Sequence, residues 1–267
     1  RNQAITNLNI AITTELYVEA TIDNQDGSCN NSPVFSNDPV INVCEGDPFS
    51  FNNGVTDADG DSLVFDLITP RNFVSGSFPS PIGYVGAFNP YYPVATAPAN
   101  TFSFDRNTGQ MEFTPSGIQR SVVTTRVTEY RNGRVIGTTM RDVLMVVQSC
   151  TNSKPTFTPS LLSGAGTSLN GNTVSVCAGS PLELQIQVDD PDVGEVVSIA
   201  SNLAEAIPAA NISTSGSNPV LINVQWSPTV ADLGNYIFTV RAADNSCPFK
   251  GESSIAFNIQ VQTSTVL

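Results

Sequence analysis

The stretch Thr56-Asp57-Ala58-Asp59-Gly60-Asp61-Ser62 places three carboxylates at alternate positions around a glycine, between two runs of strand-like sequence. A weaker copy, Asp189-Asp190-Pro191-Asp192-Val193-Gly194-Glu195, follows later in the chain. Calcium gathers oxygen ligands from compact loops, so alternating acids around a tight turn are typical of a calcium site. The return of the acidic stretch indicates a chain built from repeats.

Two repeats can be aligned from residue 29 onward. The matching segments are Ser28-Cys29-Asn30-Asn31-Ser32-Pro33 with Ser149-Cys150-Thr151-Asn152-Ser153-Lys154-Pro155, Val43-Cys44-Glu45-Gly46-Asp47-Pro48 with Val176-Cys177-Ala178-Gly179-Ser180-Pro181, the two acidic stretches, Phe113-Thr114-Pro115 with Trp226-Ser227-Pro228, and Arg126-Val127-Thr128-Glu129 with Arg241-Ala242-Ala243-Asp244. We therefore predict repeat one over residues 29–150 and repeat two over 151–267. Residues 1–28 read as the C-terminal end of a preceding β domain.

The secondary structure is predicted to be β throughout. Runs such as Ser121-Val122-Val123-Thr124-Thr125-Arg126-Val127 and Tyr236-Ile237-Phe238-Thr239-Val240-Arg241 are rich in β-branched and aromatic residues. Asn132-Gly133 is a type I′ hairpin signal, because both residues tolerate positive φ. Many short strands with Gly- and Pro-containing turns favour tandem, all-β, immunoglobulin-like sandwiches.

An immunoglobulin-like strand order brings the acids of each repeat to one end of its sandwich. The acidic stretch would join the second and third strands, and Glu129 or Asp244 would end the sixth. The predicted calcium ligands are Asp57, Asp59, Asp61 and Glu129 in repeat one, and Asp190, Asp192, Glu195 and Asp244 in repeat two. The alternative is a solvated acidic turn, because Asp and Gly favour turns in any case. A bound calcium would be structural, cancelling carboxylate repulsion and stiffening the joint between domains.

The same strand order constrains the five cysteines. Cys44 follows the first strand of repeat one and Cys150 ends the last, so both lie at the opposite end from the acids, and we predict a Cys44–Cys150 disulfide. By analogy, Cys177 would pair with a cysteine beyond residue 267. Cys247 is left open, and Cys29 cannot reach Cys44 across an extended strand.

Repeat one carries an insertion at about residues 70–102 that is rich in Pro, Gly and aromatic residues. It reads either as a loop that buries its rings against one sheet or as a recognition surface, since aromatic residues with polar tips anchor interfaces. Tyr84, Tyr91 and Tyr92 are the candidate partner-binding residues.

Composition excludes several classes of function. There are 24 acidic and 11 basic residues and no histidine, with a net charge of −13. Nucleic acid and anionic membranes would repel this chain. Without histidine, Ser-His-Asp and Cys-His catalysis are excluded. Asn107-Thr108-Gly109 lacks the acid of an aspartic protease, and no pair of carboxylates is singled out for a glycosidase. No apolar run is long enough to span a bilayer. We predict a protein that is not an enzyme.

The segments Cys44-Glu45-Gly46-Asp47-Pro48, Thr56-Asp57-Ala58-Asp59-Gly60-Asp61-Ser62-Leu63 and Asn107-Thr108-Gly109-Gln110 resemble repeats of large surface proteins of Bacteroidetes. These proteins often carry a gliding-motility-associated C-terminal domain and are exported by type IX secretion. Their repeats are similar to polycystic-kidney-disease (PKD) and cadherin-like sandwiches. The resemblance is close over residues 1–150 and looser over 151–267.

This resemblance implies a secreted segment of a cell-surface adhesin or filament that acts as a stiff stalk. Its partners would be neighbouring domains of the same chain, other copies in a filament, or a surface glycan or protein. The alternative is a carbohydrate- or protein-binding module that uses the aromatic insertion of repeat one.

Overall fold

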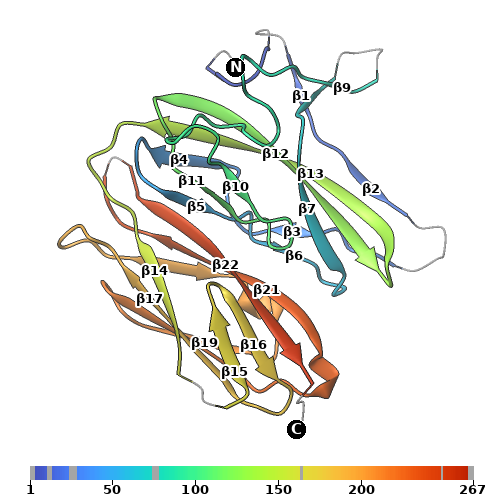
Figure 1. Cartoon of the computed structure of the whole chain (residues 1–267), viewed down its shortest axis with the longest axis vertical. Helices are drawn as coiled ribbons and strands as arrows, with labels where there is room; N and C mark the ends of the chain where they lie inside the picture. The colour runs from blue at the N-terminus through green and yellow to red at the C-terminus, as the bar shows by residue number, and fades with distance from the viewer. Residues whose placement is uncertain are drawn as a thin grey trace. The chain divides into compact units, whose positions relative to one another are not determined.

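The computed structural model describes residues 4–10, 14–23, 29–73, 78–162, 165–247 and 249–263. The chain divides into two compact units: unit 1 comprises residues 1–53 and 57–151, and unit 2 comprises residues 54–56 and 152–267. Apart from the short helix α1 (Leu203–Ala206) and the 3-10 turn η1 (Val230–Asp232), the regular structure described is β-strand (Figure 1). No helix among the described residues has the length and apolar character needed to cross a membrane.

The main strands of unit 1 form two sheets in immunoglobulin-like order. One sheet pairs β5 (Phe49–Phe51), β11 (Met111–Phe113) and β10 (Ser103–Phe104), and the other runs β7 (Ser62–Ile68), β12 (Gln119–Arg131) and β13 (Arg134–Gln148). These match the B-E-D and C-F-G strands of an immunoglobulin sandwich. β4 (Val40–Cys44) runs parallel to the C-terminal half of β13. The short strands β3 (Val34–Phe35) and β6 (Val55–Thr56) lie before and after β4 and β5 in the chain.

Unit 2 repeats this order. One sheet runs β14 (Thr156–Leu161), β17 (Leu182–Asp189), β20 (Val220–Trp226) and β19 (Asn211–Gly216), and the other runs β15 (Thr167–Asn170), β16 (Thr173–Cys177), β22 (Glu252–Gln262), β21 (Gly234–Ala243) and β18 (Ser198–Ser201). β16 is parallel to β22 as β4 is to β13. The prediction of tandem all-β, immunoglobulin-like sandwiches is confirmed.

Alternating apolar side chains explain why these segments form sandwiches. In β17 the buried positions are Leu182, Leu184, Ile186 and Val188, separated by more exposed polar residues, so one face enters the core of unit 2. The β12–β13 hairpin turns at Asn132 and Gly133, whose φ angles are 52° and 78°. Both are positive, as the predicted type I′ turn requires.

The N-terminal segment is part of unit 1, whereas the sequence predicts that residues 1–28 end a separate domain. β1 (Leu16–Tyr17) pairs with β8 (Arg71–Asn72), which in turn pairs with β9 (Ser80–Pro81), and β2 (Ala20–Ile22) pairs with the N-terminal half of β13. The Asn7 side chain is fully buried and donates to the carbonyl oxygens of Pro93 and Val122 at 2.8 and 2.9 Å. Residues 24–28 lie outside the described part of the chain.

The insertion of repeat one contributes to a second, smaller core. Leu8, Ile82 and Val122 are buried together, with Tyr84 and Leu144 packed against them. Val122 and Leu144 alternate along their strands with Val123 and Val143, which face the main core. The small core therefore covers the outer face of the β12–β13 sheet, as the loop-over-sheet interpretation expected for part of the insertion.

Cys44 and Cys150, the expected pair, form a disulfide. The bond joins the end of β4 to the segment that follows β13 and closes 106 residues of sequence. Cys29, Cys177 and Cys247 are free thiols.

We predict that replacing both Cys44 and Cys150 with alanine lowers the free energy of unfolding of unit 1 by about 2–5 kcal/mol, because a long loop regains its entropy in the unfolded chain. Denaturant titration of the oxidised protein measures this. The matched control is Cys29→Ala, which removes an exposed free thiol. Equal losses in the two variants would contradict a stabilising role for the bond.

Candidate functional site

The structure gathers the predicted acids at one end of each sandwich. Carboxylate oxygens of Asp57, Asp59 and Asp61 lie within 4.8 Å of one another in the loop before β7. Glu129, near the end of β12, is 1% exposed and experiences the charges of all three.

Unit 2 has the corresponding cluster. Asp190, 7% exposed, follows β17 and experiences the charges of Asp192, Glu195 and Asp244, the last of which directly follows β21. Each unit therefore has one buried carboxylate that experiences the charges of three other predicted ligands, while among the described residues only Asp57, Asp59 and Asp61 bring their oxygens within 4.8 Å of one another.

The first aspartate of each cluster has one oxygen engaged and one without a partner. Asp57 Oδ1 accepts from the backbone N–H groups of Asp59 and Asp61 at 2.9 and 3.1 Å, and Asp190 Oδ1 accepts from that of Asp192 at 2.8 Å. Oδ2 of both Asp57 and Asp190 is buried with no hydrogen-bond partner among the described residues. A buried, unpaired carboxylate oxygen is costly, and here it occurs at equivalent positions of the two units.

Residues of the two segments that precede the sandwiches, 29–33 and 151–155 (the linkers), complete the clusters, and the sequence did not identify them as site residues. The Asn30 side chain donates to Glu129 Oε1 at 2.9 Å, and the Asn31 backbone N–H donates to Asp59 Oδ2 at 2.6 Å. In unit 2 the Asn152 side chain donates to Asp244 Oδ2 at 2.8 Å.

The second linker contact also recurs, because the Ser153 N–H donates to Asp192 Oδ2 at 2.7 Å. The sequence pattern that could have identified these linker residues is the spacing Asn-x-x-Pro, which Asn30 shares with Pro33 and Asn152 with Pro155.

A glycine on the last strand of unit 1, and one directly before the last strand of unit 2, make room for the buried carboxylate at the end of the sixth strand. A Cβ at Gly137 would overlap Glu129 Oε2, and Gly137 is the cross-strand partner of Glu129. A Cβ at Gly251 would overlap Asp244 Oδ2, which accepts from the Gly251 N–H at 2.8 Å. Both sandwiches therefore hold a carboxylate against bare backbone.

Burial raises the pKa of Asp57, Glu129 and Asp190 above the usual range, and the neighbouring carboxylates add to the rise. Hydrogen bonds from Asn31 instead hold the pKa of the exposed Asp59 below its usual value. The inner carboxylates are thus the ones that a cation would stabilise most.

Unit 1 already places one cation in its cluster. The Arg131 guanidinium contacts both oxygens of Asp61 at 2.7 Å and lies 3.4 Å from Asp59 Oδ2. Its NH1 also donates to the Cys29 carbonyl at 3.0 Å. The residue at the equivalent distance after Asp244 is Ser246, so this arginine is specific to unit 1.

The tyrosines of the insertion separate into two environments. Tyr84 packs into the small core, where burial raises its pKa well above the usual value. Tyr91 and Tyr92 are exposed. Tyr84 is therefore placed as a packing residue, and the other two remain surface groups.

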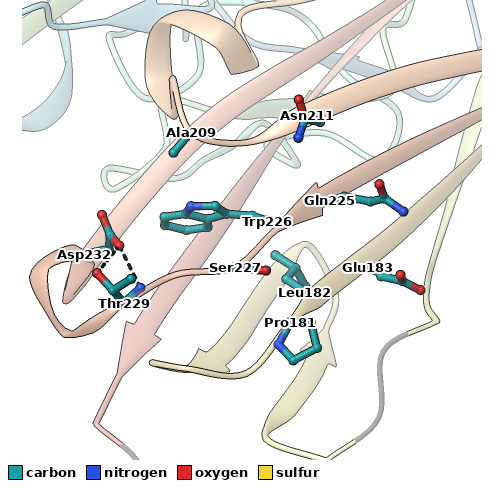
Figure 2. A pocket seen from close by; sticks show the side chains of 10 residues that line it. All are labelled: Pro181, Leu182, Glu183, Ala209, Asn211, Gln225, Trp226, Ser227, Thr229 and Asp232. Carbon is teal, nitrogen blue, oxygen red and sulfur yellow. Dashed lines mark hydrogen bonds between the residues drawn. The ribbon is translucent and has the colours of Figure 1, made fainter.

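Unit 2 has a hollow of about 540 Å³ beside Trp226 (Figure 2). Trp226 itself is 5% exposed, and its ring packs edge-on against Tyr236 with centroids 5.0 Å apart. Asp232 Oδ2 accepts from the N–H and hydroxyl of Thr229 at 2.7 and 2.8 Å, as the dashed lines in Figure 2 mark. The ring belongs to the core and this carboxylate caps η1, so both already have structural roles.

Comparison with known proteins gives no family assignment. No protein-family model matches the chain, and no curated protein matches it. Among solved structures, extracellular cadherin domains 3-6 of protocadherin gamma B2 match with 16% identity and a TM-score of 0.31, over 86% of this chain and 47% of that one. Human CDH23 EC21-23 matches with 16% identity and a TM-score of 0.28, over 87% and 70% of the two chains. A chimeric titin Z1Z2 matches with 16% identity and a TM-score of 0.26, over 89% and 100%.

The chain spans about half the length of the protocadherin gamma B2 domain 3-6 chain that it matches. At TM-scores this low, these likenesses identify neither a family nor a function.

We predict that Gly137→Ala destabilises unit 1 by about 1–3 kcal/mol, because the new methyl group must displace the buried Glu129 carboxylate. Denaturant unfolding measures the change. Gly83→Ala is the matched control, since a Cβ at Gly83 meets nothing within 4 Å. Wild-type stability in Gly137→Ala would show that the carboxylate is not held against β13.

Proposed function

We propose that this chain is a structural repeat segment of an extracellular surface protein, and that its two acidic clusters bind calcium. The observation that carries the proposal is the buried Oδ2 of Asp57 and of Asp190, which has no hydrogen-bond partner among the described residues and occurs at equivalent places in two sandwiches. A solvated acidic turn, the alternative from the sequence, would leave such oxygens in water.

The donor set fits a hard cation. The groups that would hold it are Asp57, Asp59, Asp61 and Glu129 in unit 1, and Asp190, Asp192, Glu195 and Asp244 in unit 2. Every donor is a carboxylate oxygen, which suits calcium and not a soft metal. Glu195 Oε2 is a further buried oxygen without a partner among the described residues.

Bound calcium would supply positive charge that offsets the repulsion within each cluster. The chain's own residues position the carboxylates. Gly137 and Gly251 leave space for Glu129 and Asp244, and the side chains of Asn30 and Asn152 donate hydrogen bonds to these carboxylates from the linkers. Arg131 supplies part of the required charge in unit 1, so unit 2 is expected to depend more strongly on the metal.

Export to an oxidising compartment is supported by the Cys44–Cys150 disulfide, because such bonds persist outside the cytosol. The finer identity, a Bacteroidetes adhesin or filament stalk, rests on the sequence resemblance described above. The proposed partners are neighbouring domains of the same chain and other copies in a filament.

We predict that excess calcium raises the stability of the wild-type protein in thermal unfolding, by roughly 2.7 kcal/mol at a hundredfold excess over the dissociation constant. Asp190→Asn should lose the part of this gain that belongs to unit 2. Asp189→Asn removes the same charge one residue away, where the carboxylate accepts from Gln187, and should keep the gain. No calcium response in the wild type, or an equal response in all three proteins, would refute the proposal.

The clusters also predict a pH dependence in the presence of a chelator. Burial raises the folded-state pKa of Asp190 above 3.8, its ordinary value. Between the unfolded-state pKa and the raised folded-state pKa of Asp190, the folded protein binds more protons than the unfolded chain. The contribution of Asp190 to the free energy of unfolding is therefore present at low pH and is lost as the pH rises through the folded-state pKa. Asp192, Glu195 and Asp244 face Asp190 and add to the effect.

Unfolding titrations from about pH 4 upward should therefore show a shallower decline for Asp190→Asn than for the wild type. Asp189→Asn should follow the wild-type slope. Identical slopes for the wild type and Asp190→Asn would show that Asp190 gains no proton affinity on folding.

A further inference from the structure

A second feature of unit 1, independent of the acidic clusters, is a pocket of about 580 Å³ at the open edge of the sandwich. β7 and β10 are the terminal strands of their two sheets, and residues from both line the pocket. Its volume falls within the range of about 300–1,000 Å³ that is usual for small-molecule sites. The lining residues used below are Asp66, Tyr91, Tyr92, Phe102, Phe104 and Arg106.

The pocket presents the exposed ring of Tyr91 beside aromatic rings that belong to the core. Tyr91 is 68% exposed, although its loop is well fixed: Asn89 Oδ1 accepts from the N–H groups of Tyr91 and Tyr92 at 2.9 and 3.2 Å. Phe102 forms a rigid wall, because it is buried and stacks on Phe113 with centroids 5.1 Å apart. Exposed rings on a fixed loop are pre-organised for contact with a ligand.

The polar groups of the pocket carry compensated charge. Asp66 Oδ1 pairs with Arg106 at 2.6 Å, and Asp66 Oδ2 pairs with Arg126 at 3.1 Å. The Arg106 side chain is largely exposed, so guanidinium N–H groups remain open to a ligand. The Arg106–Asp66 ion pair places hydrogen-bond donors and acceptors side by side, and its opposite charges largely cancel.

We propose that this pocket binds a segment of a neutral polysaccharide. The apolar C–H faces of sugar rings pack on aromatic faces such as those of Tyr91 and Tyr92, and adjacent hydroxyl groups match the fork of a guanidinium and the oxygens of a carboxylate. An acidic polymer fits less well, because the chain carries a net charge of −13 and Arg106 is already paired with Asp66.

The hollow beside Trp226 does not offer the same chemistry. Its aromatic ring is buried in the core of unit 2, whereas the pocket of unit 1 displays two tyrosines to solvent. The glycan site is therefore assigned to unit 1.

The test is retention of the whole chain by immobilised cellulose, laminarin, mannan, xylan and chitin, with alginate and polygalacturonate as acidic probes. One or more neutral polymers should retain the wild type, and Tyr91→Ala should weaken that binding about tenfold or more. Phe78→Ala is the matched control, because Phe78 is 93% exposed on the same insertion and outside the pocket. The thermal midpoint of each variant verifies folding.

Three results would overturn the proposal: no retention by any neutral polymer, retention by the acidic probes alone, or equal retention of wild type and Tyr91→Ala. Running every arm with calcium and with chelator keeps the two proposals apart. Loss of glycan retention with a preserved calcium-dependent rise in stability would contradict only the glycan site. Glycan retention without a calcium-dependent rise in stability would contradict only the calcium sites.

Discussion

The pairing of the last two long strands in each unit is the constraint on which both clusters depend. β12 pairs with β13, and β21 with β22, over most of their lengths. This register sets Glu129 opposite Gly137, and the Asp244 N–H bonds to the Gly251 carbonyl at 3.1 Å. Because the ladder fixes the backbone on both sides, the carboxylate can only enter where the facing residue lacks a side chain.

Buried acids of like charge are unfavourable unless something offsets their repulsion. Both units accommodate their carboxylates with the same three kinds of group: backbone N–H groups of the acidic loop, an asparagine of the linker, and a glycine without a side chain. They differ in the cation, because Arg131 enters the cluster of unit 1 and residue 246 of unit 2 is serine. Two copies of one framework have therefore diverged in how much charge they supply themselves.

Much of the fold could be predicted from the sequence, because alternating apolar residues, the Asn132-Gly133 turn and the duplicated landmarks are local signals. The acids of the two clusters could be predicted for the same reason. Gly137 and Asn30 could not, because their roles exist only after strand register and linker path bring them to Glu129. The place of the N-terminal segment in unit 1 could not be predicted, because its pairing with β8 and β13 joins residues far apart in sequence.

The disulfide of unit 1 has a mechanical consequence if the chain is pulled from its two ends. Force entering at Cys44 passes directly to Cys150, so the 106-residue span between them carries no tension while the bond lasts. At about 3.3–3.6 Å per extended residue, this withholds on the order of 350 Å of chain from stretching. Reduction of the Cys44–Cys150 bond would release this length, so the reach of a stretched chain would depend on the redox state of its surroundings.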